Sequence, residues 1–163
     1  MIRVGMGTDI HRLEMGRPLF LGGISLPWEK GLVGHSDGDC LIHALIDALL
    51  GAAGAGDIGR HFPDTDPSYL GIRSTTLLKQ TREEILPADT VIYNVDAVVT
   101  AEEPRLASFI PTMENRLAEI LGIPFSRINI KAKTNEGLGD LGRGEAIAAH
   151  VVVLLQLSPH YVD

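Results

Sequence analysis

The segment at residues 39–53 has the most regular hydrophobic pattern in the chain, because its large apolar residues recur at intervals of three and four positions. These residues are Leu41, Ile42, Leu45, Ile46, Leu49 and Leu50. The spacing predicts an amphipathic helix, and either Asp37 or Asp39 is placed to cap its first turn. Whatever else the chain forms, other elements have to cover one face of this helix.

The rest of the chain mixes strand patterns and helix patterns without a strict βαβ alternation. Strands are predicted at residues 1–9, 18–26, 91–100 and 127–133, and two more helices at residues 74–86 and 104–121. Residues 146–157 fit either a helix or a strand, and the valines at 151–153 favour a strand. Pro111 begins or perturbs the last helix, and residues 54–71 are predicted to be a loop that covers a site. These elements predict an α+β fold, with a mixed β-sheet covered on one face by helices in a two-layer sandwich of ferredoxin-like topology.

Composition limits the class of protein. With 163 residues, of which 45% are hydrophobic, the chain is expected to form one domain at residues 1–157 and a C-terminal tail at 158–163. The single cysteine, Cys40, excludes an intramolecular disulfide. No apolar run approaches the roughly 20 residues that span a bilayer, so a cytoplasmic location and no membrane partner are expected. A net charge of −7 argues against binding nucleic acid through a broad basic surface.

Two short motifs predict a metal site. Asp9 and His11 are two residues apart on a predicted strand, so they project from the same face and can bind one ion together. On the predicted helix, Asp39, His43 and Asp47 share a face, and a neighbouring carboxylate could orient the free ring N–H of the histidine. Two imidazoles and a carboxylate can hold zinc and leave one position open for chemistry. Ordinary hydrogen bonds are the alternative, because spacing alone does not bring strand and helix together.

Two further segments are candidate ligand sites. His35 and Ser36 directly precede the predicted helix, where free N–H groups and the helix dipole favour a phosphate. Capping of the helix by Ser36 and Asp37 explains the same residues equally well. The loop at residues 56–67 offers backbone donors and carboxylates to a hydroxylated ligand, and a series of Asx turns is the alternative there.

The turn at residues 137–142 has the pattern G-x-G-x-x-G after a predicted strand, which invites a dinucleotide-binding interpretation. We reject it, because the Rossmann arrangement needs a following helix, a second strand and an acidic ribose partner, and the chain ends too soon. Thr134, Glu136 and Arg143 around this turn fit a phosphate and Mg²⁺ cradle better, with Glu136 as oxygen ligand. An ordinary glycine turn is the alternative.

Five motifs follow one another in a defined order and spacing. They are Gly7-Thr8-Asp9-Ile10-His11, His35-Ser36-Asp37-Gly38-Asp39, Gly56-Asp57-Ile58-Gly59, Phe62-Pro63-Asp64-Thr65-Asp66 and Gly142-Arg143-Gly144-Glu145. Together they closely resemble the 2-C-methyl-D-erythritol 2,4-cyclodiphosphate synthase family of the non-mevalonate isoprenoid pathway, and the match spans almost the entire chain. Met6, where many members have histidine, and the stretch Lys133-Thr134-Asn135-Glu136, in place of a threonine run, depart from the family pattern.

The resemblance implies a homotrimer with active sites between neighbouring subunits. Its implied zinc ligands are Asp9, His11 and His43. His35 and Thr134 would be the catalytic residues that stabilise the transition state, and Glu136 would help hold a second divalent cation, Mg²⁺ or Mn²⁺. The implied substrate-binding residues are Asp9, Ile10, His11, His35, Ser36, Asp57, Ile58, Gly59, Phe62, Pro63, Asp64, Thr65, Asp66, Ala101, Glu102, Glu103, Pro104, Arg105, Leu106, Ala107, Lys133, Thr134, Asn135, Glu136, Asp140 and Arg143.

The implied reaction starts from 4-diphosphocytidyl-2-C-methyl-D-erythritol 2-phosphate. Attack of its 2-phosphate on the β-phosphorus of the diphosphate would close the cyclic diphosphate and release CMP. Two other classes fit the same residues. A zinc hydrolase of phosphate esters would activate water and release a linear product, and a non-catalytic trimeric module would bind a nucleotide or isoprenoid diphosphate without releasing CMP.

Overall fold

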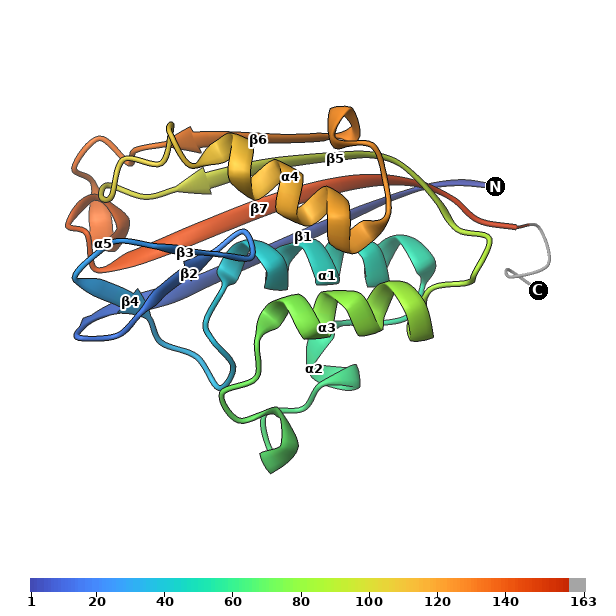
Figure 1. Cartoon of the computed structure of the whole chain (residues 1–163), viewed down its shortest axis with the longest axis horizontal. Helices are drawn as coiled ribbons and strands as arrows, with labels where there is room; N and C mark the ends of the chain where they lie inside the picture. The colour runs from blue at the N-terminus through green and yellow to red at the C-terminus, as the bar shows by residue number, and fades with distance from the viewer. Residues whose placement is uncertain (159–163) are drawn as a thin grey trace.

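A mixed five-stranded sheet and a layer of helices make up the protein in a computed structural model that describes residues 1–158 (Figure 1). The strands of this sheet are β1 (Ile2–Met15), β4 (Lys30–Leu32), β5 (Val91–Thr100), β6 (Ile128–Lys133) and β7 (Ala146–Gln156). They lie in the order β4-β1-β7-β5-β6, in which β5 and β6 are parallel and the other neighbours antiparallel. A separate hairpin joins β2 (Leu19–Leu21) to β3 (Ile24–Leu26). The predicted α+β fold with a mixed sheet is therefore confirmed.

The helices range from long core helices to single turns. They are α1 (Cys40–Ala53), α2 (Ile58–His61), α3 (Ser74–Gln80), α4 (Ile110–Leu121) and α5 (Gly139–Gly142), with 3₁₀ turns η1 (Pro67–Tyr69) and η3 (Phe125–Arg127) and a π-helical turn η2 (Thr81–Ile85). Helix α1 packs on β1 and β7, and α4 packs on β6. All six periodic leucines and isoleucines of α1 are buried, as predicted. Asp39, one of the two candidates, caps this helix by accepting the N–H of Ile42.

Two glycines in β1 let α1 lie directly on the sheet. A Cβ atom added at Gly5 would lie 1.9 Å from the carbonyl oxygen of Ala48, and one added at Gly7 would lie 1.9 Å from that of Ala44. Any side chain at either position would therefore push the helix away from the strand. Because alternate residues of a strand face the same side, the next two positions on this face are those of the predicted metal ligands. The close packing thus brings them against α1.

Several predicted elements match the observed ones, and others differ for physical reasons. Strands β5, β6 and β7 and the hairpin at residues 19–26 follow the predictions closely. Strand β1 runs well beyond the predicted end at residue 9, because it pairs with β7 from Ile2 to Arg12 and then with β4 from Leu13 to Met15. The predicted helix at 104–121 begins only at Ile110, with Pro111 in its first turn, where a missing N–H costs nothing.

The ferredoxin-like topology is wrong. A ferredoxin-like chain runs β-α-β-β-α-β, whereas the main elements here follow the order β1-α1-α3-β5-α4-β6-β7. The parallel neighbours β5 and β6 need a crossover connection, which α4 supplies, and only the four-residue α5 separates β6 from β7. This pairing depends on contacts between distant segments, which local sequence patterns do not specify.

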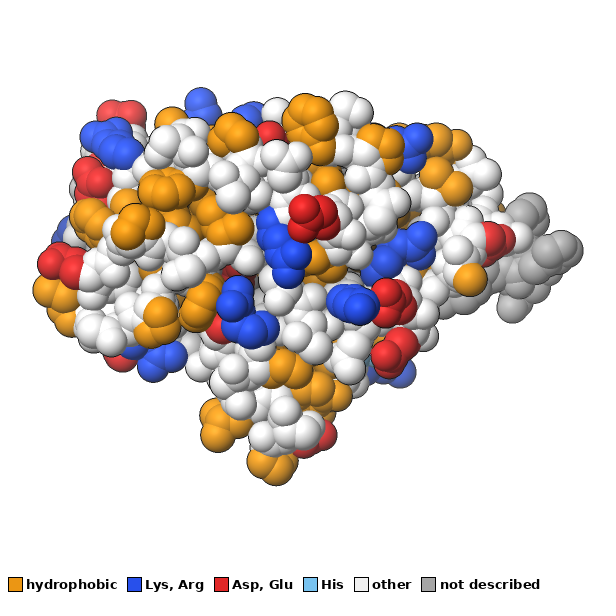
Figure 2. Space-filling model, in the orientation of Figure 1, with side chains coloured by type: hydrophobic (Ala, Val, Ile, Leu, Met, Phe, Trp, Pro, Cys, Tyr) orange, Lys and Arg blue, Asp and Glu red, His pale blue; other side chains and the backbone are white. Residues whose placement is uncertain are grey.

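The segment at residues 54–71, predicted to be a loop, contains the two short helical turns α2 and η1. Asp57 caps α2 by accepting the N–H of Arg60, and Asp66 caps η1 by accepting that of Ser68. Figure 2 shows hydrophobic side chains gathered at the tip that this segment forms. Within the segment, Leu70 is 70% exposed. Among residues 1–158, no helix combines the length and apolar character needed to cross a bilayer.

Candidate metal centre and ligand pockets

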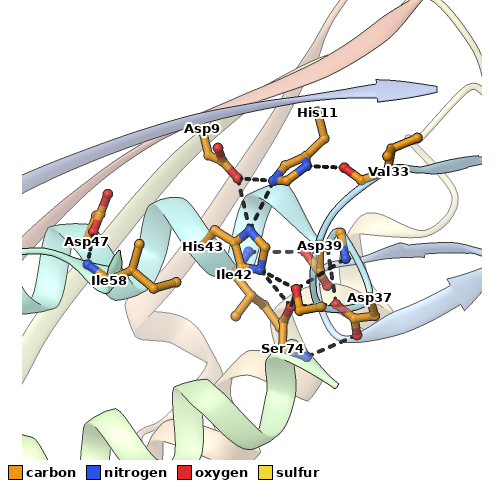
Figure 3. Close-up of polar contacts among 12 residues, drawn as sticks. Asp9, His11, Val33, Asp37, Asp39, Ile42, His43, Asp47, Ile58 and Ser74 are labelled. Atoms are coloured by element: carbon orange, nitrogen blue, oxygen red, sulfur yellow. Dashed lines mark hydrogen bonds and ion pairs between the residues drawn. The ribbon is translucent and has the colours of Figure 1, made fainter. Parts of the chain in front are cut away.

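Asp9, His11 and His43 meet where β1 crosses α1 (Figure 3). Oδ2 of Asp9 lies 2.8 Å from Nε2 of His11 and 3.1 Å from Nδ1 of His43, and these two ring nitrogens lie 3.2 Å apart. The predicted strand and helix therefore do meet. One oxygen and two nitrogen ligands converge on a point that one metal ion can occupy, which is the donor set of a zinc site with an open position.

The outer nitrogen of each ring has a hydrogen-bond partner. Nδ1 of His11 donates to the carbonyl oxygen of Val33, so its hydrogen lies away from the centre. Nε2 of His43 lies 3.0 Å from Oγ of Ser36 and 2.9 Å from Oγ of Ser74. Ligating histidines usually have such a partner on the second nitrogen, because it sets the ring orientation and tautomer.

The centre is electrostatically prepared for a cation. Burial alone would raise the pKa of the Asp9 carboxyl, but hydrogen bonds and charges from His11 and His43 hold that pKa well below its usual range. Burial likewise lowers the pKa of His11, yet the hydrogen bond and negative charge of Asp9 more than offset it, so the pKa of His11 is raised. A carboxylate that attracts a proton to its neighbour also attracts a metal ion to the same place.

The prediction that Asp39 or Asp47 orients His43 is wrong. Asp39 is fully buried and accepts the N–H groups of Gly22 and Gly23 at 3.0 and 2.7 Å, in addition to capping α1. Asp47 accepts the N–H of Ile58 at 2.7 Å. Both carboxylates share a helix face with His43, but unpaired backbone N–H groups of neighbouring segments engage them instead. Serine hydroxyls take their place.

A pocket of about 380 Å³ opens beside the three ligands. It is lined by His11, His35, Ser36, His43, Ile58, Gly59, Phe62, Pro63, Asp64, Tyr69 and Leu77. The structure therefore brings most of the predicted substrate-binding residues between 35 and 64 to the metal centre. Nε2 of His35 lies 3.3 Å from the carbonyl oxygen of Asp66, which ties this ring to the loop above the pocket. Ile10 faces the other side of β1 and is 57% exposed.

A second pocket, of about 150 Å³, forms where β5 and β6 end. It is lined by Ala101, Pro104, Arg105, Leu106, Ala107, Ala132, Lys133 and Thr134. Glu102 accepts the N–H of Asn135 at 3.1 Å, so the two predicted ligand segments support each other. In the part of the chain that the structure describes, these two pockets share no lining residue. Glu136, hydrogen-bonded by Thr134 at 3.2 Å, is likewise outside the three-ligand cluster.

The glycine-rich turn holds its charged residues in one small network. Arg143 donates to Asp140 and, at 2.9 Å, to Glu145. It also lines a pocket of about 220 Å³ that includes Trp28 and Lys30. The predicted ligand residues Asp140 and Arg143 are thus adjacent to each other, but they contribute to neither of the two pockets described above.

Four residues at the metal centre or its pocket were not predicted from the sequence. Val33 and Ser74 bond the two histidine rings, and Tyr69 and Leu77 line the pocket. Ser74 stands at the start of a predicted helix, which places it at a helix end but gives no sign that His43 lies opposite. These residues act through contacts between segments far apart in the chain.

Comparison with known proteins finds relatives that match almost the entire chain. A family model described as the YgbB family matches residues 2–156. A 2-C-methyl-D-erythritol 2,4-cyclodiphosphate synthase of Laribacter hongkongensis is 54% identical over 155 residues, 95% of this chain and 96% of that protein. A structure of such a synthase with CDP bound aligns with a TM-score of 0.86 and 40% identity over 94% of this chain and 100% of the other. The bifunctional IspDF of Campylobacter jejuni aligns with a TM-score of 0.92 and 41% identity over 97% of this chain and 43% of that one.

Proposed function

The chain belongs to the YgbB family, and from this membership we propose that it converts 4-diphosphocytidyl-2-C-methyl-D-erythritol 2-phosphate into 2-C-methyl-D-erythritol 2,4-cyclodiphosphate and CMP. Such an enzyme is a phosphorus–oxygen lyase of isoprenoid precursor synthesis. The observation that carries the proposal is the convergence of Asp9, His11 and His43 beside a pocket. Of the segments at residues 57–59 and 62–66, which would contact the erythritol part, this pocket is lined by Ile58, Gly59, Phe62, Pro63 and Asp64.

The proposed reaction needs positioning more than proton transfer. The 2-phosphate attacks the β-phosphorus of the diphosphate, the bond to the CMP oxygen breaks, and the ring closes. A phosphate monoester is already largely ionised near neutral pH, so no general base is required. What the protein has to supply is alignment of the two phosphates and neutralisation of their charge.

The donor set of Asp9, His11 and His43 fits Zn²⁺, with the fourth position left to substrate phosphate. Glu136 would help hold a second divalent ion, Mg²⁺ or Mn²⁺, whose hard oxygen preference matches a carboxylate. When bound, the two ions supply Lewis-acid polarisation and charge neutralisation on the diphosphate.

His35 and Thr134 are the proposed catalytic residues. His35 lines the pocket beside the three ligands, and its ring is anchored to the carbonyl oxygen of Asp66. Thr134 lines the second pocket and donates to Glu136. Each would donate a hydrogen bond to a phosphate oxygen that gains charge in the transition state, an interaction that lowers the barrier. The segment at residues 101–107 would bind the cytidine part.

We propose that both pockets serve one active site because subunits of a homotrimer bring them together. Within one chain the two pockets share no lining residue, which supports an active site completed by a second subunit. The sheet face opposite α1 exposes a band of large apolar side chains, which a neighbouring subunit would cover. These side chains are Ile2, Val4, Met6, Ile10 and Val152. A cytoplasmic location is part of the same proposal.

Release of CMP from the diphosphocytidyl substrate tests the function. We expect CMP and a cyclic product of matching mass, and we expect both to disappear when a chelator strips the protein of metal. A zinc phosphohydrolase would instead give a linear product one water heavier, and a binding module would give no CMP at all. Either of these two results would refute the proposal.

A further inference from the structure

A chain of hydrogen bonds runs from His43 through Ser74 to Asp37, and the proposed reaction gives it no role. Nε2 of His43 lies 2.9 Å from Oγ of Ser74, and that hydroxyl contacts Oδ1 of Asp37 (Figure 3). Asp37 also accepts the backbone N–H of Ser74 at 3.0 Å and Nε of Arg73 at 2.9 Å. Ser74 is fully buried, and only 4% of the Asp37 side chain is exposed. The contact between Ser74 and Asp37 is therefore shielded from water.

The direction of each hydrogen bond in this chain follows from the acceptor at its end. An ionised carboxylate only accepts hydrogen bonds, so the hydroxyl hydrogen of Ser74 points at Asp37. The Ser74 oxygen is then left to accept, and its nearest remaining neighbour that can donate is Nε2 of His43, at 2.9 Å, with Oγ of Ser36 farther off at 3.3 Å. With its hydrogen on Nε2, neutral His43 has a bare Nδ1 that can bind a metal ion. Nδ1 lies 3.1 Å from Oδ2 of Asp9, so in metal-free protein this carboxylate competes with Ser74 for the single ring hydrogen.

We propose that Ser74, held by Asp37, is a positioning residue that fixes His43 in the tautomer able to bind metal. The inference rests on the proposed function, since it concerns the same metal centre. If the Ser74 hydroxyl were free to rotate, it could donate to Nε2 and drive the hydrogen to Nδ1. That hydrogen would then occupy the point on which the three ligand atoms converge.

Ser36 contacts the same ring nitrogen but does not fix the tautomer of His43. Its Oγ lies 3.0 Å from Nε2 of His43 and 3.3 Å from Oγ of Ser74. Among the described residues it has no carboxylate partner, so its hydroxyl is free to donate or to accept. Arg73, by contrast, supports the chain, because its guanidinium pairs with Asp37 and lies 4.0 Å from the centre of the Phe20 ring.

Metal affinity provides the first test. Metal-free protein is titrated with Zn²⁺ against a chromophoric chelator, and we expect Ser74→Ala to weaken binding roughly 10- to 100-fold, the usual effect of losing a partner of a ligating histidine. Asp37→Asn should weaken binding in the same way. The new amide group can donate a hydrogen bond to the Ser74 oxygen, and the Ser74 hydroxyl hydrogen can then turn toward His43. Thr76→Ala, an exposed change on the same helix, is the matched control and should leave the affinity unchanged.

The tautomer itself provides the second test, and it does not depend on activity or on metal. The ring ¹⁵N shifts of His43 in metal-free protein, followed over a pH series to the neutral imidazole, should report hydrogen on Nε2. Ser74→Ala and Asp37→Asn should move population to Nδ1, and Ser74→Thr, which restores a hydroxyl, should move it back.

Two results would overturn the proposal: hydrogen on Nδ1 in the unmodified protein, or unchanged zinc affinity in both Ser74→Ala and Asp37→Asn. Failure of the proposed reaction has a different signature. The unmodified protein would then bind zinc and show the expected tautomer, yet release no CMP.

Discussion

The side chain of His43 is the ligand whose removal tests the metal centre most directly. We expect His43→Ala to retain no zinc after dialysis and to lose turnover, because Asp9 and His11 alone fall short of the three protein ligands of a catalytic zinc site. Metal analysis of the dialysed protein measures this. His61→Ala is a suitable control, since His61 bonds the carbonyl oxygen of Ala55 and is outside the cluster. Full zinc content in His43→Ala would show that the ion is held elsewhere.

Glu136 separates the roles of the two proposed ions. We expect Glu136→Ala to keep its zinc but to lose the activity that added Mg²⁺ or Mn²⁺ supports, because this carboxylate is outside the three-ligand cluster. Zinc analysis combined with CMP release over a range of Mg²⁺ concentrations measures both effects. Glu119→Ala, which removes an exposed carboxylate that pairs with Arg116 on α4, should change neither. Loss of zinc in Glu136→Ala would contradict the assignment.

Sequence patterns identified individual ligands better than they identified the residues that support them. The two-residue spacing of Asp9 and His11 predicted a shared face, since a strand has a period of two wherever it lies. The partner of His43 was predicted to be a carboxylate on its own helix, and it is instead Ser74, 31 positions away. Side chains that meet through tertiary packing leave no local pattern, so the supporting contacts emerge only from the fold.

The packing of β1 on α1 predicts a sharp contrast between two glycine substitutions. We expect Gly7→Ala to destabilise the protein by about 3 kcal/mol or more, because its Cβ would meet backbone that cannot move without separating helix from strand. We expect Gly51→Ala to stabilise the protein by up to about 1 kcal/mol, because Gly51 lies in a helix and the atom nearest to an added Cβ, the carbonyl oxygen of Met6, is 4.0 Å away. Urea unfolding at one fixed protein concentration compares them. Equal stability of the two variants would mean that the strand does not pack on the helix this closely.

Elements with strong local patterns were predicted almost to the residue, and short ones were not. The apolar stripe of α1 and the β-branched run of β5 identify themselves from sequence. The three-residue β4 exists because it pairs with the end of β1, and α2 depends on its cap Asp57. Such elements are stabilised by their neighbours rather than by their own composition, which is why residues 54–71 were predicted to be a plain loop.

The whole assembly is where sequence patterns are least informative, because both strand order and subunit contacts depend on distant surfaces. The predicted ferredoxin-like topology was wrong. The residues of the two pockets were predicted only as separate ligand-binding segments of the sequence. Their separation in one chain has a direct consequence. In the proposed trimer, each active site is formed by the metal centre of one subunit and the pocket at the ends of β5 and β6 of another. In that arrangement, a substitution in the metal centre and a substitution in this pocket act on one active site from two different subunits.

Mixed oligomers test this division. His43→Ala and Glu136→Ala chains are each expected to be inactive alone, but every trimer that contains both kinds of chain has one interface that pairs an intact metal centre with an intact Glu136. Co-expressed chains carrying different affinity tags, purified through both tags, should therefore recover activity. A chain carrying both substitutions, mixed with either single variant, provides no interface with two intact halves and should stay inactive. Activity that fails to return in the mixed oligomer would place both halves of the site in one chain.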